Sequence, residues 1–223
     1  MKGDRFLPKT GLKEYAGRGT TAKRRSLGMF SDARSKQVIW MAHCILNQNS
    51  ISDGTADYPG PIQEIMEYLS CSRIGIVQMP CPELHCLGLD RGDPRGCERP
   101  VVIENTRIRT ALDRSASRRI LKRLVDSVIF QMEEYRRYGF TLVGIVGVNR
   151  SPSCGVDTTS KKDREVRGKG LFIEALHREL EKRHLRIETI GIKTGEMSRS
   201  LKKLRALVDG YRSEENPTTN LNP

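Results

Sequence analysis

The stretch Phe140-Thr-Leu-Val-Gly-Ile-Val-Gly-Val148 is almost continuously apolar, and it follows Gly139, which ends a helical pattern. A strand that is covered by helices on both faces has this composition, whereas a strand with one wet face alternates apolar and polar residues. We therefore predict that residues 140–148 form a central strand of a parallel sheet.

Three more strand-like runs surround this one in the sequence, at 37–43, 74–79 and 186–192. Segments with helical spacing of apolar residues separate or follow them, at about 61–70, about 118–138, 171–184 and 198–211. The regular alternation of strand and helix predicts an α/β fold. We expect a single-domain parallel sheet flanked by helices, with three layers (α/β/α), of the Rossmann-like or flavodoxin-like kind.

The two ends of the chain differ from this pattern. Residues 1–36 carry ten Lys or Arg against three Asp or Glu, which accounts for +7 of the net charge of +12. We expect a basic, disordered leader at 1–36, the α/β domain at 37–212, and a disordered tail at 213–223 that lacks any apolar period.

The leader also bears on partners and location. Lys and Arg can bind the phosphates of nucleic acid, but the composition favours a solvated leader without such a partner. The leader has no apolar core of a signal peptide, and no run elsewhere approaches the roughly 18–20 apolar residues of a membrane helix. We expect a cytoplasmic protein that acts on a small molecule and has no membrane partner. The oligomeric state stays open.

Six cysteines in a cytoplasmic chain are expected to be thiols and not disulfides. Cys44, Cys81 and Cys154 each follow a predicted strand, and the carboxyl ends of parallel strands converge on one crevice. Three thiolates without an obvious fourth ligand favour a soft metal or an iron–sulfur cluster with one open position. The spacing of Cys81 and Cys86 also allows a zinc site, and unligated loop thiols remain a third reading.

A resemblance to a known family narrows these readings. Cys81-Pro-Glu83, then Gly88 and Pro94-Arg95, then Ser151-Pro-Ser-Cys-Gly155, and then Gly168-Lys-Gly-Leu-Phe-Ile-Glu-Ala-Leu176 resemble the motif series of the DUF523 and thiouracil desulfurase family. The resemblance covers roughly residues 38–193. It implies a [4Fe-4S] cluster held by Cys44, Cys81 and Cys154, with one open iron site that takes sulfur from a thiolated base such as 2-thiouracil. It also implies that Glu83 and Ser151 are the catalytic acid/base pair.

The chemistry of these two residues agrees with that role, but each has an ordinary reading. A carboxylate two residues from a cluster ligand can activate water and pass a proton on. Glu83 could instead be a loop carboxylate paired with Arg91 or Arg95, and Ser151 could cap the turn that Pro152 begins.

The substrate side is less well defined by the sequence. The first motif, Ala42-His-Cys-Ile-Leu-Asn47, departs from the S-A-C-L-L-G typical of the family, and no R-Y-D-G element follows, so the chain resembles a divergent branch. His85 and Cys86 remain alternatives to Cys81 as ligands. The residues that we expect to bind the substrate are Asn47, Arg95, Asn149 and Ser153.

The leading hypothesis is therefore an iron–sulfur desulfurase that removes sulfur from a thiolated nucleobase or a related small thio compound and releases sulfide. Two alternatives remain. One is a zinc-stabilised nucleic-acid-binding module, and the other is an iron–sulfur or sulfur-carrier protein without turnover of its own.

Overall fold

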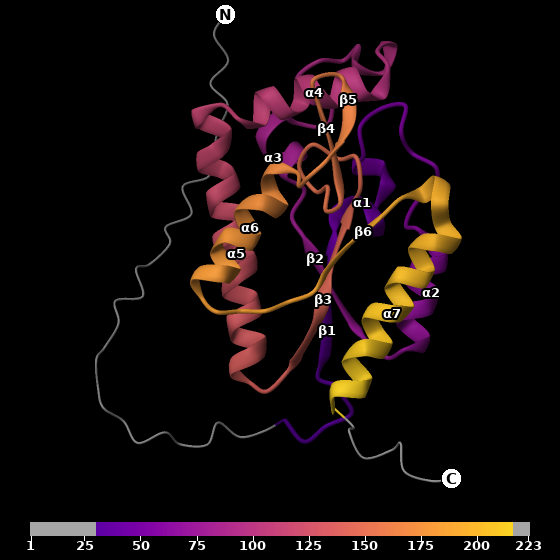
Figure 1. Ribbon diagram of the computed structural model, residues 1–223, viewed down its shortest axis with the longest axis vertical. Coiled ribbons are helices and arrows are strands. Elements are labelled where there is room, and N and C mark those ends of the chain that lie inside the picture. Colours follow the sequence, from indigo (N-terminus) through magenta and orange to yellow (C-terminus); the bar gives the residue numbers. More distant parts are fainter. Residues whose placement is uncertain (1–29, 216–223) are drawn as a thin grey trace, which may run out of the picture. The chain divides into compact units, whose positions relative to one another are not determined.

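Four parallel strands form the central sheet, in the order β2-β1-β3-β6. The computed structural model describes residues 30–215, so most of the predicted leader (1–29) and the end of the predicted tail (216–223) lie outside the described residues (Figure 1). The strands are β1 (Gln37–Ala42), β2 (Gly75–Met79), β3 (Thr141–Val148) and β6 (Thr189–Ile192). All four predicted strands are present.

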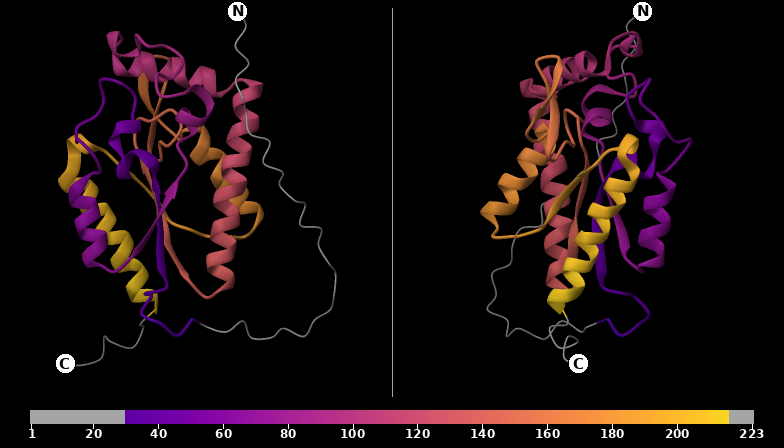
Figure 2. Two further views of the ribbon diagram at one scale, coloured as in Figure 1. Left: turned by 180° about the vertical axis from the view of Figure 1, so that it is seen from behind. Right: turned by 45° about the vertical axis from the view of Figure 1, so that its right-hand side comes forward.

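Helices cover both faces of this sheet. α2 (Gln63–Cys71) and α7 (Met197–Glu215) lie on one face, and α5 (Ser115–Arg137) and α6 (Leu171–Lys182) lie on the other (Figures 1 and 2). The three-layer α/β/α fold that the sequence predicts is confirmed. Gly139, with φ of +76°, follows α5 in the left-handed conformation that commonly ends helices.

β1 and β3 lie in the middle of the sheet, and they are apolar after their first residues. Ile39, Trp40 and Met41 are fully buried, although successive residues of a strand point to opposite faces. The Trp40 ring packs edge-on against Tyr135 of α5, with 5.7 Å between the ring centroids. Both faces of β1 are therefore covered. This agrees with the sequence of the neighbouring β3, which predicts a sheet with helices on both faces.

The strand order creates a switch point at the carboxyl ends of β1 and β3. β1 pairs with β2 on one side and with β3 on the other, both in parallel. The chain therefore leaves β1 in one direction and later returns to its opposite side, which opens a crevice outside the strand ends in sheets of this kind.

Short elements gather at that end of the sheet (Figure 1). They are α1 (His43–Leu46), η1 (Gln48–Ser50), α3 (Pro82–Leu87), η2 (Gly96–Glu98), α4 (Val101–Leu112), the antiparallel hairpin of β4 (Thr158–Lys161) and β5 (Arg164–Arg167), and η3 (Thr194–Glu196).

None of these elements has a counterpart in the sequence-based prediction, and for two of them, α4 and the hairpin, the sequence shows the reason. The buried face of α4 includes Glu104 and Asn105, and these polar residues interrupt the apolar stripe that identifies a helix. The hairpin lies in the charged segment 157–167, which predicts a loop because few of its residues are apolar.

No helix in the described part of the chain combines the length and the apolar character that a membrane crossing requires.

Candidate functional site

A cavity of about 460 Å³ lies at the switch point of the sheet. Its walls come from segments that follow each of the four strands: α1 after β1, the start of α3 after β2, residues 148–154 after β3, and residues 192–196 after β6. The volume is within the range of about 300–1,000 Å³ that is typical of small-molecule sites.

The three cysteines that follow predicted strands all line this cavity. Cys44 lies in α1 and is half-buried, Cys81 precedes α3 as its N-cap, and Cys154 lies in the loop after β3. Cys81 and Cys154 are 8% and 6% exposed. The prediction that the fold brings these three thiols to one place is therefore confirmed.

Burial shifts the titration of all three thiols in the same direction. It raises the pKa of Cys44 to about 12, with further increases from Cys81 and Glu83. It also raises the pKa of Cys81, and Glu83 adds to this effect. The pKa of Cys154 is raised well above its ordinary value by burial and then by Cys44 and Cys81. The free thiols are therefore protonated at neutral pH.

The two alternative ligands do not line the cavity. The Cys86 thiol donates to the Ser117 carbonyl of α5 at 3.8 Å, and burial raises its pKa to about 11. The His85 ring contacts the Cys81 carbonyl through Nδ1 at 2.7 Å. Both side chains are engaged with the protein, which leaves Cys81 as the thiol of this segment that faces the cavity.

The donor set can be compared with what different metal groups require. In the part of the chain that the structure describes, no group of three His, Cys, Asp or Glu side chains is arranged to hold a metal ion. One zinc ion needs every ligand sulfur at about 2.3 Å. A cluster of several atoms accepts thiolates that stand further apart around a cavity, and cysteine thiolates are its usual ligands. Three thiols that line one cavity are donors of the kind that such a cluster uses.

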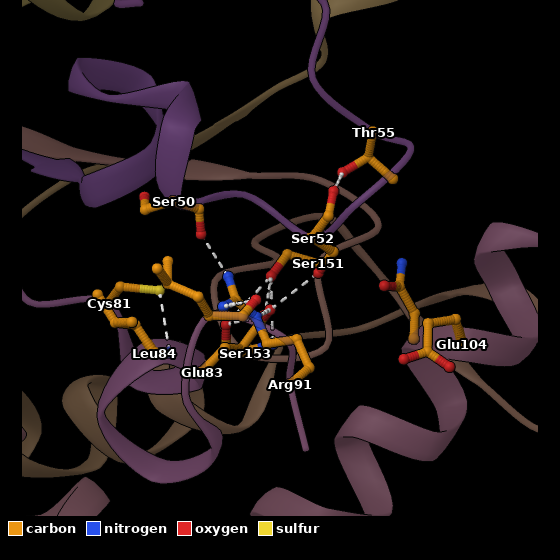
Figure 3. A network of polar contacts seen from close by, with 12 residues as sticks. Ser50, Ser52, Thr55, Cys81, Glu83, Leu84, Arg91, Glu104, Ser151 and Ser153 are labelled. Atoms are coloured by element: carbon orange, nitrogen blue, oxygen red, sulfur yellow. Dashed lines mark hydrogen bonds and ion pairs between the residues drawn. The ribbon is translucent and has the colours of Figure 1, made fainter. Parts of the chain in front are cut away.

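The carboxylate of Glu83 is the centre of a polar network near the Cys81 thiol (Figure 3). Its Oε1 accepts from Ser153 Oγ at 2.6 Å and from Ser151 Oγ at 3.3 Å. Its Oε2 accepts from Arg91 Nε at 3.1 Å and from Ser52 Oγ at 3.5 Å. Glu83 is 7% exposed, and donors from three separate loops hold its orientation.

Arg91 is the cation of this network, and it is 3% exposed. Besides Glu83, its guanidinium donates to the Gly88 and Leu89 carbonyls at 2.9 and 3.1 Å and to the Ser50 carbonyl. The guanidinium thus ties the segment after β2 to the segment after β1. Of the two arginines that the sequence offers as partners for Glu83, the structure selects Arg91.

Ser151 makes the turn cap that its sequence allows, and it also contacts Glu83. Its Oγ accepts the backbone N–H groups of Ser153 and Cys154 at 3.2 and 2.9 Å, so it caps the turn that Pro152 begins. The same oxygen also lies beside Glu83. Ser153 makes the shorter contact to the carboxylate, and its side chain is 1% exposed.

The four residues expected to bind substrate divide into two pairs. Ser153 and Asn149 line the cavity, whereas Asn47 and Arg95 do not. The Asn149 Oδ1 accepts from the N–H groups of residues 156–158, so this side chain shapes the loop. Asn47 caps η1, and Arg95 is 75% exposed and pairs with Glu98.

Other polar residues line the cavity without having been singled out by the sequence. Gln48 is 3% exposed, and its Oε1 accepts from the N–H groups of Asp57 and Tyr58, which holds the loop over the cavity. Ser52 and Asn105 are also buried in the wall. Gln48 is adjacent to Asn47, which the sequence analysis selected. Both are polar residues that follow a strand end, so the same sequence signal could have identified Gln48.

The comparisons with known proteins add one relative. The chain is 27% identical over 157 residues to uncharacterized protein MJ0003 of Methanocaldococcus jannaschii, and the alignment covers 70% of this chain and 86% of that protein. No family model matches the chain, and no solved structure matches it. The relative's name supplies no activity, so a functional proposal must rest on the residues of the cavity.

The glycine of the strand end is required for the close approach of the loop that carries Cys154. A Cβ at Gly147 would lie 2.3 Å from the Cys154 carbonyl oxygen and 2.6 Å from Val156 Cγ2, whereas a Cβ at Gly60 would have no neighbour within 4 Å. We expect Gly147→Ala to lower the free energy of unfolding by about 1–3 kcal/mol through overpacking, and Gly60→Ala to change it little. Urea denaturation of both variants measures this, and equal stabilities would contradict the packing described.

Arg91 and Arg95 provide a second matched pair. Removing one partner of a buried ion pair leaves an uncompensated charge, so we expect Arg91→Ala to cost about 3–5 kcal/mol of unfolding free energy. Arg95→Ala removes only an exposed pair and should have little effect. The midpoints of urea denaturation compare the two, and similar midpoints would show that the Arg91–Glu83 pair does not support the fold.

Proposed function

We propose that this protein is a desulfurase that hydrolyses the C=S bond of a thiolated nucleobase or a related small thio compound. The reaction takes one water and yields the oxo compound and hydrogen sulfide, with no net oxidation or reduction. The observation that carries the proposal is the presence of three thiols and one buried carboxylate, Glu83, around a single cavity. The resemblance of the C-P-E and S-P-S-C-G motifs supports the same chemistry.

Cys44, Cys81 and Cys154 are the residues that would hold the cofactor, a [4Fe-4S] cluster with one open iron site. When bound, such a cluster supplies a Lewis acid that polarises a C=S bond. The thiols must lose their protons to bind iron, and their raised pKa values mean that cluster binding releases protons.

Glu83 is proposed as the general base for water and the donor of a proton to the leaving sulfur. Its Oε2 is held by Arg91 and Ser52, so proton transfer falls to Oε1, which receives the two serine hydroxyls. Ser153 at 2.6 Å is the direct partner of that oxygen, and Ser151 at 3.3 Å lies next to Ser153. In this arrangement a proton can pass between Glu83 and the hydroxyl pair without a change in position of the carboxylate.

The substrate class remains part of the proposal, as does a cytoplasmic location. A reducing cytoplasm keeps the thiols available for iron. The loop that differs most from the family pattern, residues 42–50, provides His43, Cys44, Gln48 and Ser50 to the cavity wall. Selectivity for the substrate is therefore expected to differ from that of typical members.

The first test measures the cofactor. Protein purified without oxygen should contain about four iron and four acid-labile sulfide per chain if one [4Fe-4S] cluster is bound. Cys44→Ser, Cys81→Ser and Cys154→Ser should each lose most of this iron, while Cys71→Ser and Cys86→Ser should retain it. An iron-free native protein that cannot be reconstituted, or iron loss on changing Cys86 but not Cys81, would refute the assignment.

The second test measures how much the Glu83 carboxylate contributes to the rate of sulfide release. Glu83→Gln should reduce sulfide release from 2-thiouracil or a similar thioamide by about 10²–10⁴-fold, the usual contribution of a general acid or base. Glu98→Gln, an exposed carboxylate of the same segment, should leave the rate unchanged. Iron content and circular dichroism of each variant show whether the site is still assembled. Full activity of an iron-replete Glu83→Gln variant would remove Glu83 from the mechanism.

A further inference from the structure

The hairpin of β4 and β5 is fastened to the wall of the cavity. Thr159 of β4 forms a bridge with Arg150, and the Ser160 hydroxyl donates to the Arg150 carbonyl at 2.8 Å. Glu165 of β5 pairs with Lys193 at 2.7 Å. Arg150 and Lys193 both line the cavity, so the hairpin has a fixed position beside the candidate site (Figure 1).

This hairpin carries a concentrated positive charge. Outside the leader the chain has a net charge of +5, and residues 158–169 account for +3 of it. Within the described residues, no ion pair involves any of the five cations of this segment. All five are exposed: Lys161, Lys162, Arg164, Arg167 and Lys169.

The register of the hairpin places two of these cations opposite each other, which destabilises the hairpin. Lys161 lies directly opposite Arg164, and like charges at opposed positions of an antiparallel pair are destabilising. The turn between them, Lys162-Asp163, has φ of +54° and +58°, which is the tight two-residue type that fixes hairpin register. Asp163 is the acid at the tip, and Glu165 is already paired with Lys193. The hairpin is rigid, and it holds these cations together although their repulsion is destabilising. Binding of an external anion would relieve that repulsion.

We propose that the β4–β5 hairpin binds the phosphodiester backbone of a single-stranded nucleic acid. A backbone presents anions at regular intervals, and Lys and Arg bind it with release of counterions. The cavity beside the hairpin, at about 460 Å³, has room for a base but not for a duplex, and a base can enter such a cavity only when it is unpaired. Delivery of a thiolated base from the bound strand to the cavity rests on the proposed function, whereas backbone binding does not.

The experiment measures binding of fluorescein-labelled twelve-nucleotide oligouridine to the full chain by anisotropy, at several salt concentrations. The hairpin variant Lys161→Ser/Arg164→Ser is compared with Arg136→Ser/Arg186→Ser, which removes two exposed cations that precede β3 and β6 at the other end of the sheet. We expect the hairpin variant to bind about tenfold more weakly near 0.1 M salt. The slope of log K against log salt should fall by about 1.4, because each phosphate contact contributes about 0.7 for single strands. The control variant should change affinity less than twofold.

Several outcomes decide the proposal. Equal affinity of the two variants would overturn it, since binding would then come from the leader or from charge in general. Binding without salt dependence would also overturn it. A hairpin variant that loses binding to vesicles of anionic phospholipid, but keeps binding to the oligonucleotide, would overturn it in favour of a membrane surface. Equal loss of oligouridine and oligothymidine binding supports recognition of the shared backbone, and loss for oligouridine alone supports RNA.

Two further measurements keep the result interpretable. If circular dichroism shows that Lys161→Ser/Arg164→Ser is misfolded, Arg167→Ser/Lys169→Ser removes two cations of the same segment and must show the same loss of binding. Sulfide release from free 2-thiouracil should be equal in the hairpin variant and the native protein. A native protein that binds the oligonucleotide through the hairpin but releases no sulfide would refute the proposed function and leave the binding surface intact.

Discussion

The buried pair of Glu83 and Arg91 is the interaction on which the cavity depends. Removing two charges from water costs several kcal/mol for each ion, and attraction between them offsets this only when the remaining donors and acceptors are also satisfied. Here Arg91 has three backbone carbonyls as further partners, and Glu83 has three serine hydroxyls. These partners come from the segments after β1, β2 and β3. A single charge pair therefore joins the three loops that carry the thiols.

Burial of the site also determines the charge state of the thiols. Arg91, Arg150 and Lys193 are the Lys and Arg residues that line the cavity in the described part of the chain. Arg91 is paired with Glu83, Lys193 is paired with Glu165, and Arg150 is exposed. Burial is the main cause of the raised pKa values of the three thiols, and Arg91 offsets it only in part for Cys44 and Cys81. The positive charge of a metal would lower these pKa values, so metal binding at this site would be coupled to deprotonation of the thiols.

The sequence predicts the positions of the thiols better than the polar groups around them. Cys44, Cys81 and Cys154 follow apolar strands, and the convergence of parallel strand ends is a property of the fold. The sequence does not show which of Arg91 and Arg95 pairs with Glu83, because both lie in one Gly- and Asp-rich loop. Only their burial in the folded protein distinguishes them. Asn47 and Gln48 differ by one position, and the tight turn at η1 decides which of them faces the cavity.

Most of the non-glycine residues with positive φ fall into two groups, those at helix ends and those near the candidate site. Arg73 and His184 have positive φ because each follows the cap of a helix, where the left-handed conformation is common. Arg91, Arg150, Lys162 and Asp163 also have positive φ, but they lie at the cavity wall or at the tip of the hairpin. Such conformations cost of order 1–3 kcal/mol each and persist where the surroundings enforce them. Arg91 is held by hydrogen bonds to Glu83 and to the Ser50 carbonyl, and Arg150 is held by the Ser160 hydroxyl. Lys36, just before β1, also has positive φ. At the carboxyl ends of the strands, positive φ coincides with the buried charge of Arg91 and with the like charges of the hairpin, and departures of this kind are expected at functional sites.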